Sequence, residues 1–475
     1  MNFVFFTNGL VLIFFAALMG GDALIFHETA TVFGFSAMLV GLIGTALSLA
    51  SSSSFLGLHR LHTFILTTSV WLTAAVAGAV PLYLWSLSPA DALFEAMSGI
   101  TTTGSTVMSG LDATPHGIIL WRALLQGVGG VGFIVTGIAL LPILKVGGMQ
   151  LFRTESSDKG EKELRNATMF ASATLKIYLG LIALCALVYL VGGMSFFEAV
   201  THAMTTLSTG GYSGYDASFG HFQSPFLQWS ATLFMLLGAF PFAWYIRGVY
   251  RGSLRSEQVS AMIWSLGAVI GTLTLWLSIS DDMNVFVALR LTAFNVVSVV
   301  TTTGYATTDY TLWGPFAVSA FFFLTAVGGC TGSTAGGAKA VRWLIFGRAV
   351  KAQIQRIHSP SRVTTIKYEG RRVDDDVISG VLSFFVLYAV TFAIMSVVLT
   401  LLGLDITTAT SGALTALANV GPGIGSIIGP AGNFSTLTDP QKLVLSLGMF
   451  LGRLEMLTVF VLISPVFWRE VGVFR

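Results

Sequence analysis

The chain has 475 residues, of which 54% are apolar and 10% are charged, whereas soluble domains carry about 25% charged residues. Such a chain has too little polar surface to cover itself in water, which excludes the soluble classes and indicates a membrane protein. The net charge of +2 favours no class of partner. The two cysteines, Cys185 and Cys330, lie in apolar or glycine-rich stretches and predict neither a disulfide framework nor a metal site.

Ten apolar runs are long enough to cross a membrane, which takes about 20 mostly apolar residues. In chain order they lie near 3–25, 31–56, 63–87, 116–144, 167–192, 225–250, 258–280, 313–348, 377–403 and 440–468. We expect the first run to be a retained helix rather than a cleaved signal, because another apolar run follows it at once.

Four shorter runs alternate with the later long ones, near 90–100, 195–206, 285–300 and 407–418. They are too short to cross, so we expect re-entrant helices. The sequence therefore predicts an all-α polytopic membrane protein with two leading helices and four helix–pore-loop–helix repeats around a pseudo-four-fold pore. The predicted divisions are 1–58 for the leading pair and 59–150, 151–257, 258–362 and 363–475 for the repeats.

Positive charge predicts the orientation of these helices. If the N-terminus is cytoplasmic and the short runs are re-entrant, all but five of the 25 Lys and Arg fall on the cytoplasmic side. The five exceptions lie within helices or at their ends and are Arg122, Arg290, Lys339, Lys442 and Arg453. If the short runs crossed the membrane instead, alternate basic loops would lie outside and the bias would vanish.

Each short run ends in a polar turn that contains glycine. The first and third turns match at a Phe, a Ser, three Thr and a Gly, whereas the fourth is the most diverged. In the second repeat the same elements occur with three extra residues between Phe197 and the glycine. The candidate cation ligands are Thr102, Thr103, Gly104, Ser208, Thr209, Gly210, Thr302, Thr303, Gly304, Asn419, Val420 and Gly421.

Such turns suit a dehydrated cation at membrane depth. Carbonyl oxygens can replace its water shell, glycine allows consecutive carbonyls to face one axis, and a helix C-terminus carries about half a negative charge. Ser88, the pair Ser195 and Glu198, and Asp405 are predicted caps that start three of the short helices. One Thr-Thr-Thr-Gly is more often a plain turn or a packing patch, but four such turns at a period near 100 residues predict a pore.

These motifs resemble those of the Trk/Ktr/HKT potassium transporter superfamily, specifically its bacterial TrkH-type subunit. The resemblance covers about 60–475, is also carried by 329–337 and 452–456, and the two leading helices fit the extra pair of this subtype. It implies one filter glycine per repeat, here Gly104, Gly210, Gly304 and Gly421, with glycine at the first position favouring K⁺ over Na⁺. It further implies a homodimer in the bacterial inner membrane and a cytoplasmic ring of nucleotide-binding regulatory subunits.

The run 328–337 contains five glycines in ten residues and cannot form a sturdy helix. We expect a flexible loop under the filter, which the resemblance makes a gate; its candidate residues are Gly329, Gly332, Ser333, Thr334, Gly336 and Gly337. The alternative is a packed helix kink. We expect Lys339, just beyond, to extend to the lipid headgroups.

Arg453 lies within an apolar run, where an ionisable group is costly and usually functional. The resemblance places it in the pore below the filter. The alternative is a buried pair with Glu455, although residues two apart on a helix point about 200° away from each other. The carboxylates of Glu95 and Glu198 have two possible roles from the sequence alone: they attract cations, or they stabilise the N-terminus of their helix.

The sequence thus predicts K⁺ uptake across the plasma membrane through a gated, channel-like pore, with K⁺ in the filter as the bound ion. The alternative is a secondary transporter coupled to H⁺ or Na⁺, which usually shows inverted repeats and a midplane carboxylate; a subunit of a pump complex is a minor alternative. No catalytic set converges, so we expect no enzyme, and lipid rather than nucleic acid surrounds the chain. The basic segment 351–376, with a hairpin turning at Glu369 and Gly370, either suits docking of the regulatory ring or only reflects orientation.

Overall fold

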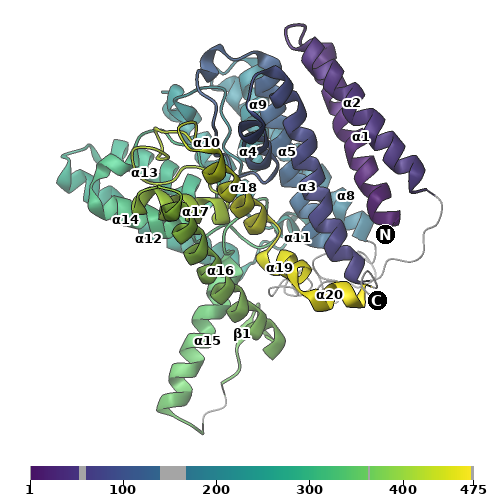
Figure 1. The fold of residues 1–475 in the computed structure, drawn as a ribbon. Coiled ribbons are helices and arrows are strands. Elements are labelled where there is room, and N and C mark those ends of the chain that lie inside the picture. The colour runs from purple at the N-terminus through teal and green to yellow at the C-terminus, as the bar shows by residue number, and fades with distance from the viewer. Residues whose placement is uncertain (1, 53–59, 140–166, 362–363, 472–475) are drawn as a thin grey trace.

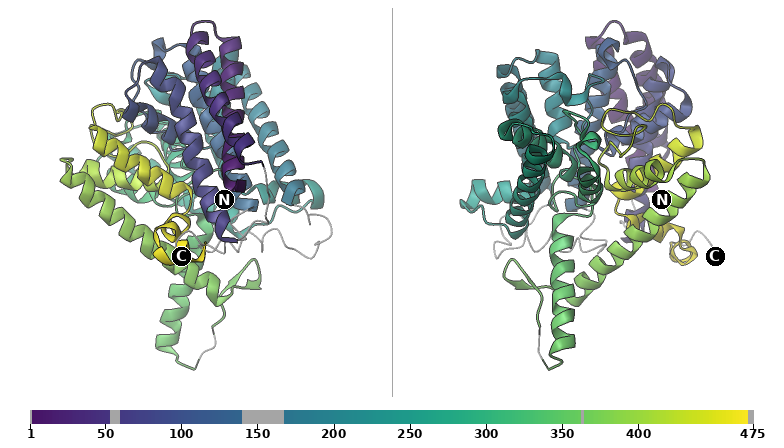
Figure 2. Two further views of the ribbon diagram at one scale, coloured as in Figure 1. Left: turned by 45° about the vertical axis from the view of Figure 1, so that its right-hand side comes forward. Right: turned by 90° about the vertical axis from the view of Figure 1, so that its left-hand side faces the viewer.

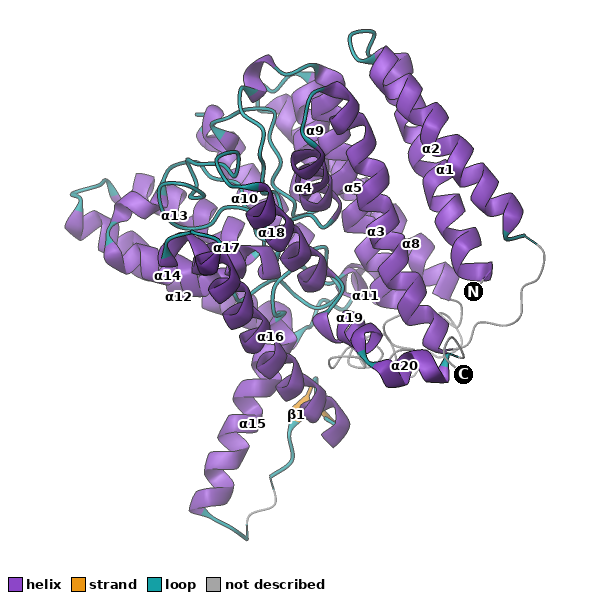
Figure 3. Ribbon diagram, viewed as in Figure 1, coloured by secondary structure: helices purple, strands orange, loops and turns teal. Residues whose placement is uncertain are grey.

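The computed structural model describes residues 2–52, 60–139, 167–361 and 364–471, and these fold almost entirely into helices (Figures 1 and 3). The two leading helices, α1 (Asn2–Ile25) and α2 (Ala30–Ala50), form an antiparallel pair whose first member packs against α3. Gly9 and Gly44 let the pair approach closely, since a Cβ on Gly44 would lie 2.9 Å from the Gly9 carbonyl oxygen. Six described helices could each cross a membrane by length and composition, and two bent helix pairs could each form a further span.

Four units of long helix, short helix and long helix follow the leading pair. The first contains α3 (Arg60–Trp85), α4 (Pro89–Ile100) and α5 (His116–Ala139), and the second α8 (Ala167–Val191), α9 (Phe196–Leu207), α10 (Pro225–Ala239) and α11 (Phe242–Arg251). The third contains α12 (Glu257–Ser280), α13 (Val285–Val300), α14 (Pro315–Thr325) and α15 (Ala340–His358), and the fourth α16 (Asp375–Leu401), α17 (Ile406–Ala418), α18 (Asp439–Arg453), α19 (Met456–Ile463) and α20 (Pro465–Glu470). Short 3₁₀ helices at Leu111–Ala113, Ser218–His221 and Tyr310–Trp313 lie in the loops after the first three short helices. The predicted fold class is confirmed; the predicted end of the 116–144 helix lies outside the described residues.

The short helices begin where the sequence predicts. Ser88 accepts a hydrogen bond from the Asp91 amide, and Ser195 and Glu198 form a complete capping box. Asp405 accepts from the Thr408 amide, and the hydrogen bonds from Thr408 hold the pKa of this carboxyl below its ordinary value. The third helix also has a side-chain cap, Asn284, which the sequence analysis missed.

Two of the runs predicted to be long enough to span, 225–250 and 440–468, each fold into a bent pair of helices rather than one straight helix. Helices α10 and α11 meet at 89° and α18 and α19 at 110°. Pro241 causes the first break, because it lacks an N–H and forces Phe240 into an extended conformation. At the second break Glu455 has a positive φ of 60°. The interruption predicted within 313–348 is confirmed, since residues 326–339 separate α14 from α15.

Helix α15 and a two-stranded hairpin project from one end of the molecule, the end toward which both termini lie (Figure 2). Strands β1 (Lys367–Tyr368) and β2 (Arg371–Arg372) pair antiparallel, with Lys367 opposite Arg372. Glu369 and Gly370 both have positive φ, as a two-residue hairpin turn with the twist of its strands requires. The predicted hairpin is therefore confirmed.

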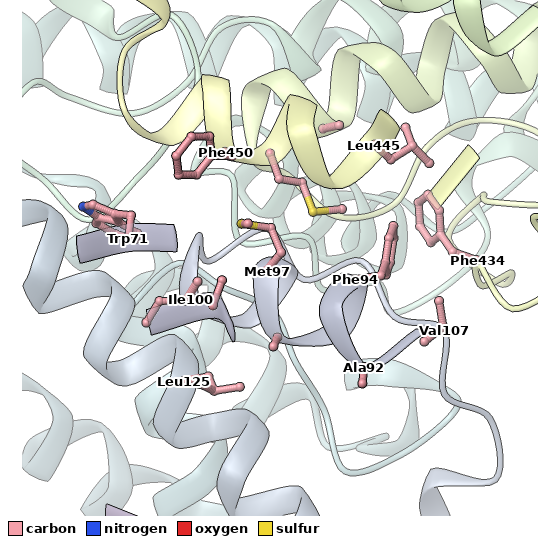
Figure 4. Close-up of a cluster of buried hydrophobic side chains, with 14 of the residues drawn as sticks. Trp71, Ala92, Phe94, Met97, Ile100, Val107, Leu125, Phe434, Leu445 and Phe450 are labelled. Carbon is pink, nitrogen blue, oxygen red and sulfur yellow. The ribbon is translucent and has the colours of Figure 1, made fainter. Parts of the chain in front are cut away.

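Helix α4 is buried on nearly every side by α3, α5 and α18 (Figure 4). Phe94 packs against Phe434 with ring centroids 5.4 Å apart, and Ile100 lies in the same apolar cluster as Trp71 and Leu125. A helix of 12 residues buried in this way is positioned by its neighbours rather than by contact with lipid. Its C-terminal end is therefore held at a fixed depth inside the protein.

Candidate selectivity filter and gate

All four short helices end in the same hydrogen-bonded turn. An amide donates to the carbonyl five residues earlier, and the preceding amide donates to a carbonyl three residues earlier, which together define a Schellman motif. The bonds that span five residues run from the amide of the first residue to the carbonyl of the second: Thr103 to Ser98 (2.8 Å), Gly210 to Thr205 (2.9 Å), Thr303 to Ser298 (2.8 Å) and Val420 to Thr415 (3.1 Å). The motif satisfies carbonyls that a helix end would otherwise leave unpaired in an environment without water.

The motif places one residue per turn in the left-handed region, normally the position of a glycine. Here the four residues are Thr102 (φ 53°), Thr209 (φ 52°), Thr302 (φ 59°) and Asn419 (φ 54°). Asparagine tolerates this region, but a β-branched threonine is an outlier there, and each such residue costs about 1–3 kcal/mol. All four are buried, so the surrounding structure enforces the conformation.

Two residues after each left-handed residue stands a glycine that faces the neighbouring repeat. A Cβ on Gly104 would lie 2.2 Å from the Gly210 carbonyl oxygen, and one on Gly211 would lie 1.8 Å from that of Thr303. A Cβ on Gly304 would lie 2.0 Å from the Val420 oxygen, and one on Gly421 would lie 2.8 Å from that of Thr103. Repeat one thus meets two, two meets three, three meets four and four meets one. The four turns form a closed ring.

The second repeat has a different register from the one expected. Gly211, not Gly210, has the positive φ of Gly104, Gly304 and Gly421, and it lines with them a cavity of about 530 Å³. Gly210 instead aligns with the residue before each of these glycines. The helices α4 and α9 both have 12 residues, so the three extra residues expected in repeat two are absent. Ser208 caps α9 one position before the aligned triad.

A sequence signal for the correct register did exist. The cap residues Ser88 and Ser195 each precede the ring glycine of their repeat by 16 positions, as Asp405 precedes Gly421. Aligning the helix starts therefore gives Gly211, whereas matching the Phe residues and the Thr-Gly steps of the turns gives Gly210.

Behind the ring, a buried ion pair within the first repeat also contacts the second repeat. Glu95 and Arg122 lie 2.9 Å apart with side chains that are 0% and 1% exposed. The carboxylate accepts from the Val107 amide at 2.9 Å, and the guanidinium donates to the Ser213 carbonyl at 2.7 Å. Glu95 is therefore a structural support of the loops above the ring, and the sequence analysis missed its pairing with Arg122. Glu198 is the capping residue of α9.

Gln126 supports the second turn directly. Its Nε2 donates to the Gly210 carbonyl at 2.6 Å, and its Oε1 accepts from the Tyr212 amide at 3.0 Å. The Tyr212 hydroxyl then donates to the Glu95 carbonyl at 2.8 Å. A continuous chain of hydrogen bonds therefore links the turn of repeat two to the short helix of repeat one.

The loop 326–339, which separates α14 from α15, lies against three of the four turns. The Thr334 hydroxyl is 3.0 Å from the Leu207 carbonyl oxygen and 3.2 Å from the Thr209 hydroxyl. The Gly336 amide donates to the Thr302 hydroxyl at 2.7 Å. A Cβ on Gly336 would lie 2.5 Å from the Ala418 carbonyl oxygen. The predicted gate residues are thus brought next to the predicted ligands.

Further contacts hold this loop closed on itself and on α10–α12. Gly332 accepts from the Phe242 amide at 2.9 Å, and the Thr331 amide donates to Gln258 at 2.9 Å. Gly328 and Gly337 touch at the base of the loop, where a Cβ on Gly337 would lie 2.4 Å from the Gly328 Cα. Gly329 and Ser333 lie between these anchors, and Ser333 donates to the Cys330 carbonyl at 2.7 Å.

Arg453, the last residue of α18, is buried and reaches the same loop. Its guanidinium donates to the Thr334 carbonyl at 2.9 Å and to the Gly129 carbonyl at 3.2 Å. The helix breaks directly after it, and Glu455 forms an ion pair at 2.6 Å with Arg342 of α15. The expectation for Lys339 is wrong, because this residue is 2% exposed and donates to the Ala335 carbonyl within the loop.

A closed ring of four re-entrant turns with a loop beneath it defines a membrane protein of the four-repeat pore-loop class. A family model described as the cation transport protein TrkH matches residues 32–277 and 259–469. The chain belongs to this family, as the resemblance implied.

Curated relatives and a solved structure agree with this assignment. The Trk system potassium uptake protein TrkI of Halomonas elongata is 47% identical over 93% of this chain and 91% of its own. TrkH of Escherichia coli is 33% identical over 97% of this chain and 98% of its own. The crystal structure of the potassium transporter TrkH from Vibrio parahaemolyticus matches with a TM-score of 0.90 at 29% identity, covering 98% of this chain and 99% of that one.

We expect Glu95→Gln to destabilise the protein by about 3–5 kcal/mol, because it leaves the Arg122 charge buried without its carboxylate. Thermal unfolding in detergent, followed by intrinsic fluorescence, measures the change. The matched control is Glu257→Gln, which breaks the Glu257–Arg348 pair, whose side chains are about one-third exposed, and should cost about 0–1 kcal/mol. Equal shifts in the two variants would contradict a supporting role for the buried pair.

Proposed function

We propose that the chain carries K⁺ into the cell through a gated, channel-like pore. The observation that carries this proposal is the closed ring in which each repeat's glycine faces the next repeat's carbonyl. The printed names of the relatives, potassium uptake proteins and a potassium transporter, support K⁺ as the ion. The ligands we propose are the backbone carbonyls of Thr102–Gly104, Thr209–Gly211, Thr302–Gly304 and Asn419–Gly421.

The chemistry of the ring suits a monovalent cation. Four helix C-termini meet there, and each contributes about half a negative charge at close range. Consecutive carbonyl oxygens can replace the hydration shell of K⁺. The cavity lined by all four ring glycines gives hydrated ions access to this point. Glu95 and Glu455 are both held in buried ion pairs, so neither serves as the free midplane carboxylate of a coupled transporter; this favours the channel-like alternative.

The gate we propose is the loop 326–339 together with Arg453. In this state the guanidinium lies beside the loop and its positive charge opposes the passage of cations. Opening requires Arg453 to leave the Thr334 carbonyl and the loop to leave the turns. Because Thr334 contacts Thr209 and Gly336 contacts Thr302, displacement of the loop alters the ring itself.

The orientation and the partners belong to the same proposal. We place the cavity that the ring glycines line on the outside of the bacterial inner membrane, and the N-terminus, α15 and the hairpin in the cytoplasm. A cavity of about 580 Å³ beside the hairpin is lined by Arg348, Lys351 and Lys367, which suits the acidic surface of a regulatory ring. We also propose a homodimer and a nucleotide-binding regulatory ring, both on the basis of the family resemblance. The proposed division of the chain is 1–58, 59–150, 151–257, 258–362 and 363–475.

Flux into liposomes tests the filter. Gly104→Ser should abolish or strongly reduce the preference for K⁺ over Na⁺, because Gly104 has a φ of 85° and its new Cβ would overlap the Gly210 carbonyl. The control is Gly110→Ser, which has a similar φ of 72° but, among the residues that the structure describes, no neighbour within 4 Å of its new Cβ. Unchanged selectivity in Gly104→Ser, or loss of flux in the wild type without a proton or sodium gradient, would overturn the channel-like reading.

The register of the second turn gives a separate prediction. Gly211→Ala should abolish selective flux, because its Cβ would lie 1.8 Å from a backbone oxygen at a φ of 76°. Gly210→Ala should be milder, because the atoms nearest to its Cβ belong to the end of the Gln126 side chain rather than to the backbone, and because Gly210 has no positive φ to strain. Selectivity measured by competing Rb⁺ and Na⁺ uptake distinguishes the two variants. The reverse order of severity would restore Gly210 as the ring glycine.

Removal of the Arg453 side chain should raise flux without abolishing selectivity. Arg453→Ala deletes charge-assisted hydrogen bonds worth about 1.5–3 kcal/mol, so the open population should rise roughly tenfold or more. Arg453→Lys retains the charge and should stay closer to the wild type. Single-channel or flux recordings in bilayers provide the measurement, and reduced or unchanged flux in Arg453→Ala would refute the gating role.

A further inference from the structure

A third cavity, of about 390 Å³, lies inside the helical body. Helices α1, α3, α4 and α5 line it, with Val11, Phe14, Trp71, Ile100 and Gly132 among its walls. Ile100 is the last residue of α4, so one wall of the cavity lies at the depth of the filter turn. Thr7, near the start of α1, lines the cavity on the side toward the N-terminus.

The cavity offers nothing to a polar ligand. Its two polar side chains, Thr7 and Thr67, donate their hydroxyl hydrogens to Phe3 and Thr63 in their own helices, both at 2.9 Å. An apolar cavity of about 150 Å³ already stays dry and accepts a molecule such as benzene. A cavity more than twice as large with the same character suits an apolar occupant rather than water.

Contacts on two sides hold α1, which forms one wall of the cavity, in its place. Asn8 of α1 donates to the Ser69 hydroxyl at 2.8 Å and accepts from the Thr73 hydroxyl at 2.7 Å, which clamps α1 to α3. The close contact of Gly9 with α2 holds the other side of α1. A buried polar clamp of this kind determines the distance between two helices.

The mouth of the cavity opens to the lipid side. Phe14 lines the cavity and yet is 48% exposed, and its neighbour Leu10 is 47% exposed on the outer face of the same helix. Both belong to a helix with a mean hydropathy of 2.2, suited to cross the bilayer. The apolar molecules present at that depth are the acyl chains of phospholipids.

The inner wall of the cavity is also part of the gate region. Trp71 lies 5.8 Å from the Arg453 guanidinium. The carbonyl oxygen of Gly129, which also lines the cavity, accepts a hydrogen bond from Arg453. An occupant of the cavity therefore contacts residues that position Arg453.

We propose that this cavity binds one phospholipid acyl chain from the leaflet on the gate side, inserted past Phe14 as far as Trp71 and Ile100. The site is separate from the ion path and does not depend on which cation the pore carries. The chain fills the space behind Trp71 and Gly129 and so supports the wall against which Arg453 rests.

Photo-crosslinking of the full chain tests this site. The protein is reconstituted in vesicles of phosphatidylethanolamine and phosphatidylglycerol that contain a phosphatidylcholine with a diazirine in the middle of one acyl chain. After irradiation, adducts are mapped by mass spectrometry. We expect adducts on Trp71 and Ile100, which are 5% and 2% exposed and so cannot be reached from the bilayer surface.

Two filling variants and a matched control complete the experiment. Val11→Trp and Gly132→Leu fill the cavity from α1 and from α5 and should each reduce labelling of Trp71 and Ile100 at least severalfold. Leu10→Trp adds the same indole to the outer face of α1 and should leave this labelling unchanged. Adducts confined to exposed residues such as Leu10 and Phe14, or equal labelling in all variants, would overturn the proposal and favour another occupant, such as a second copy of the chain.

Discussion

A helix that ends inside a membrane protein leaves carbonyl groups that water cannot reach, and the rest of this structure depends on how four such ends are closed. Each short helix uses a Schellman turn, which pairs two of the orphan carbonyls within the chain. The turn requires a left-handed residue, and the next two residues then pass close to the neighbouring repeat. Only glycine fits where Gly104, Gly211 and Gly304 face a carbonyl of that repeat. The same turn therefore pairs the carbonyl groups at the helix end and brings the four repeats together into a ring.

The three threonines held in the left-handed region carry a local cost that the surroundings must offset. The Thr302 hydroxyl accepts from Gly336, and the Thr209 hydroxyl contacts Thr334, so the gate loop takes part in that stabilisation. The fourth repeat uses Asn419, which tolerates the conformation and donates to Met449 of α18 instead. The filter and the gate therefore share hydrogen bonds in two repeats, whereas Asn419 of the fourth repeat is held by α18 and by the Thr103 hydroxyl of the first repeat.

Much of this arrangement could be predicted from local signals in the sequence. Short apolar runs with capped starts indicated the re-entrant helices, and Ser195 with Glu198 formed the predicted box. Glu369 and Gly370 formed the predicted turn. These features depend on residues that are near one another in the chain, where spacing and propensity decide the outcome.

The errors concern features that tertiary contacts decide. Arg453, at the break of α18, donates to a loop that is distant in sequence, and Lys339 is buried because that loop packs against the turns of other repeats. The pairing of Glu95 with Arg122 joins helices whose apposition no local pattern encodes. The error in the register of the second turn has another cause. The spacing from the helix caps indicates the correct register, but the Gly210-Gly211 pair allows two alignments and the wrong glycine was chosen.

The central claim is that the ring of turns is a cation site on one axis. The most direct measurement is a structure of the protein in Tl⁺, whose anomalous scattering marks a K⁺-like ion without ambiguity. We predict anomalous density at the centre of the ring, surrounded by the carbonyl oxygens of Thr103, Gly210, Thr303 and Val420. Density bound elsewhere, with none within the ring, would contradict it.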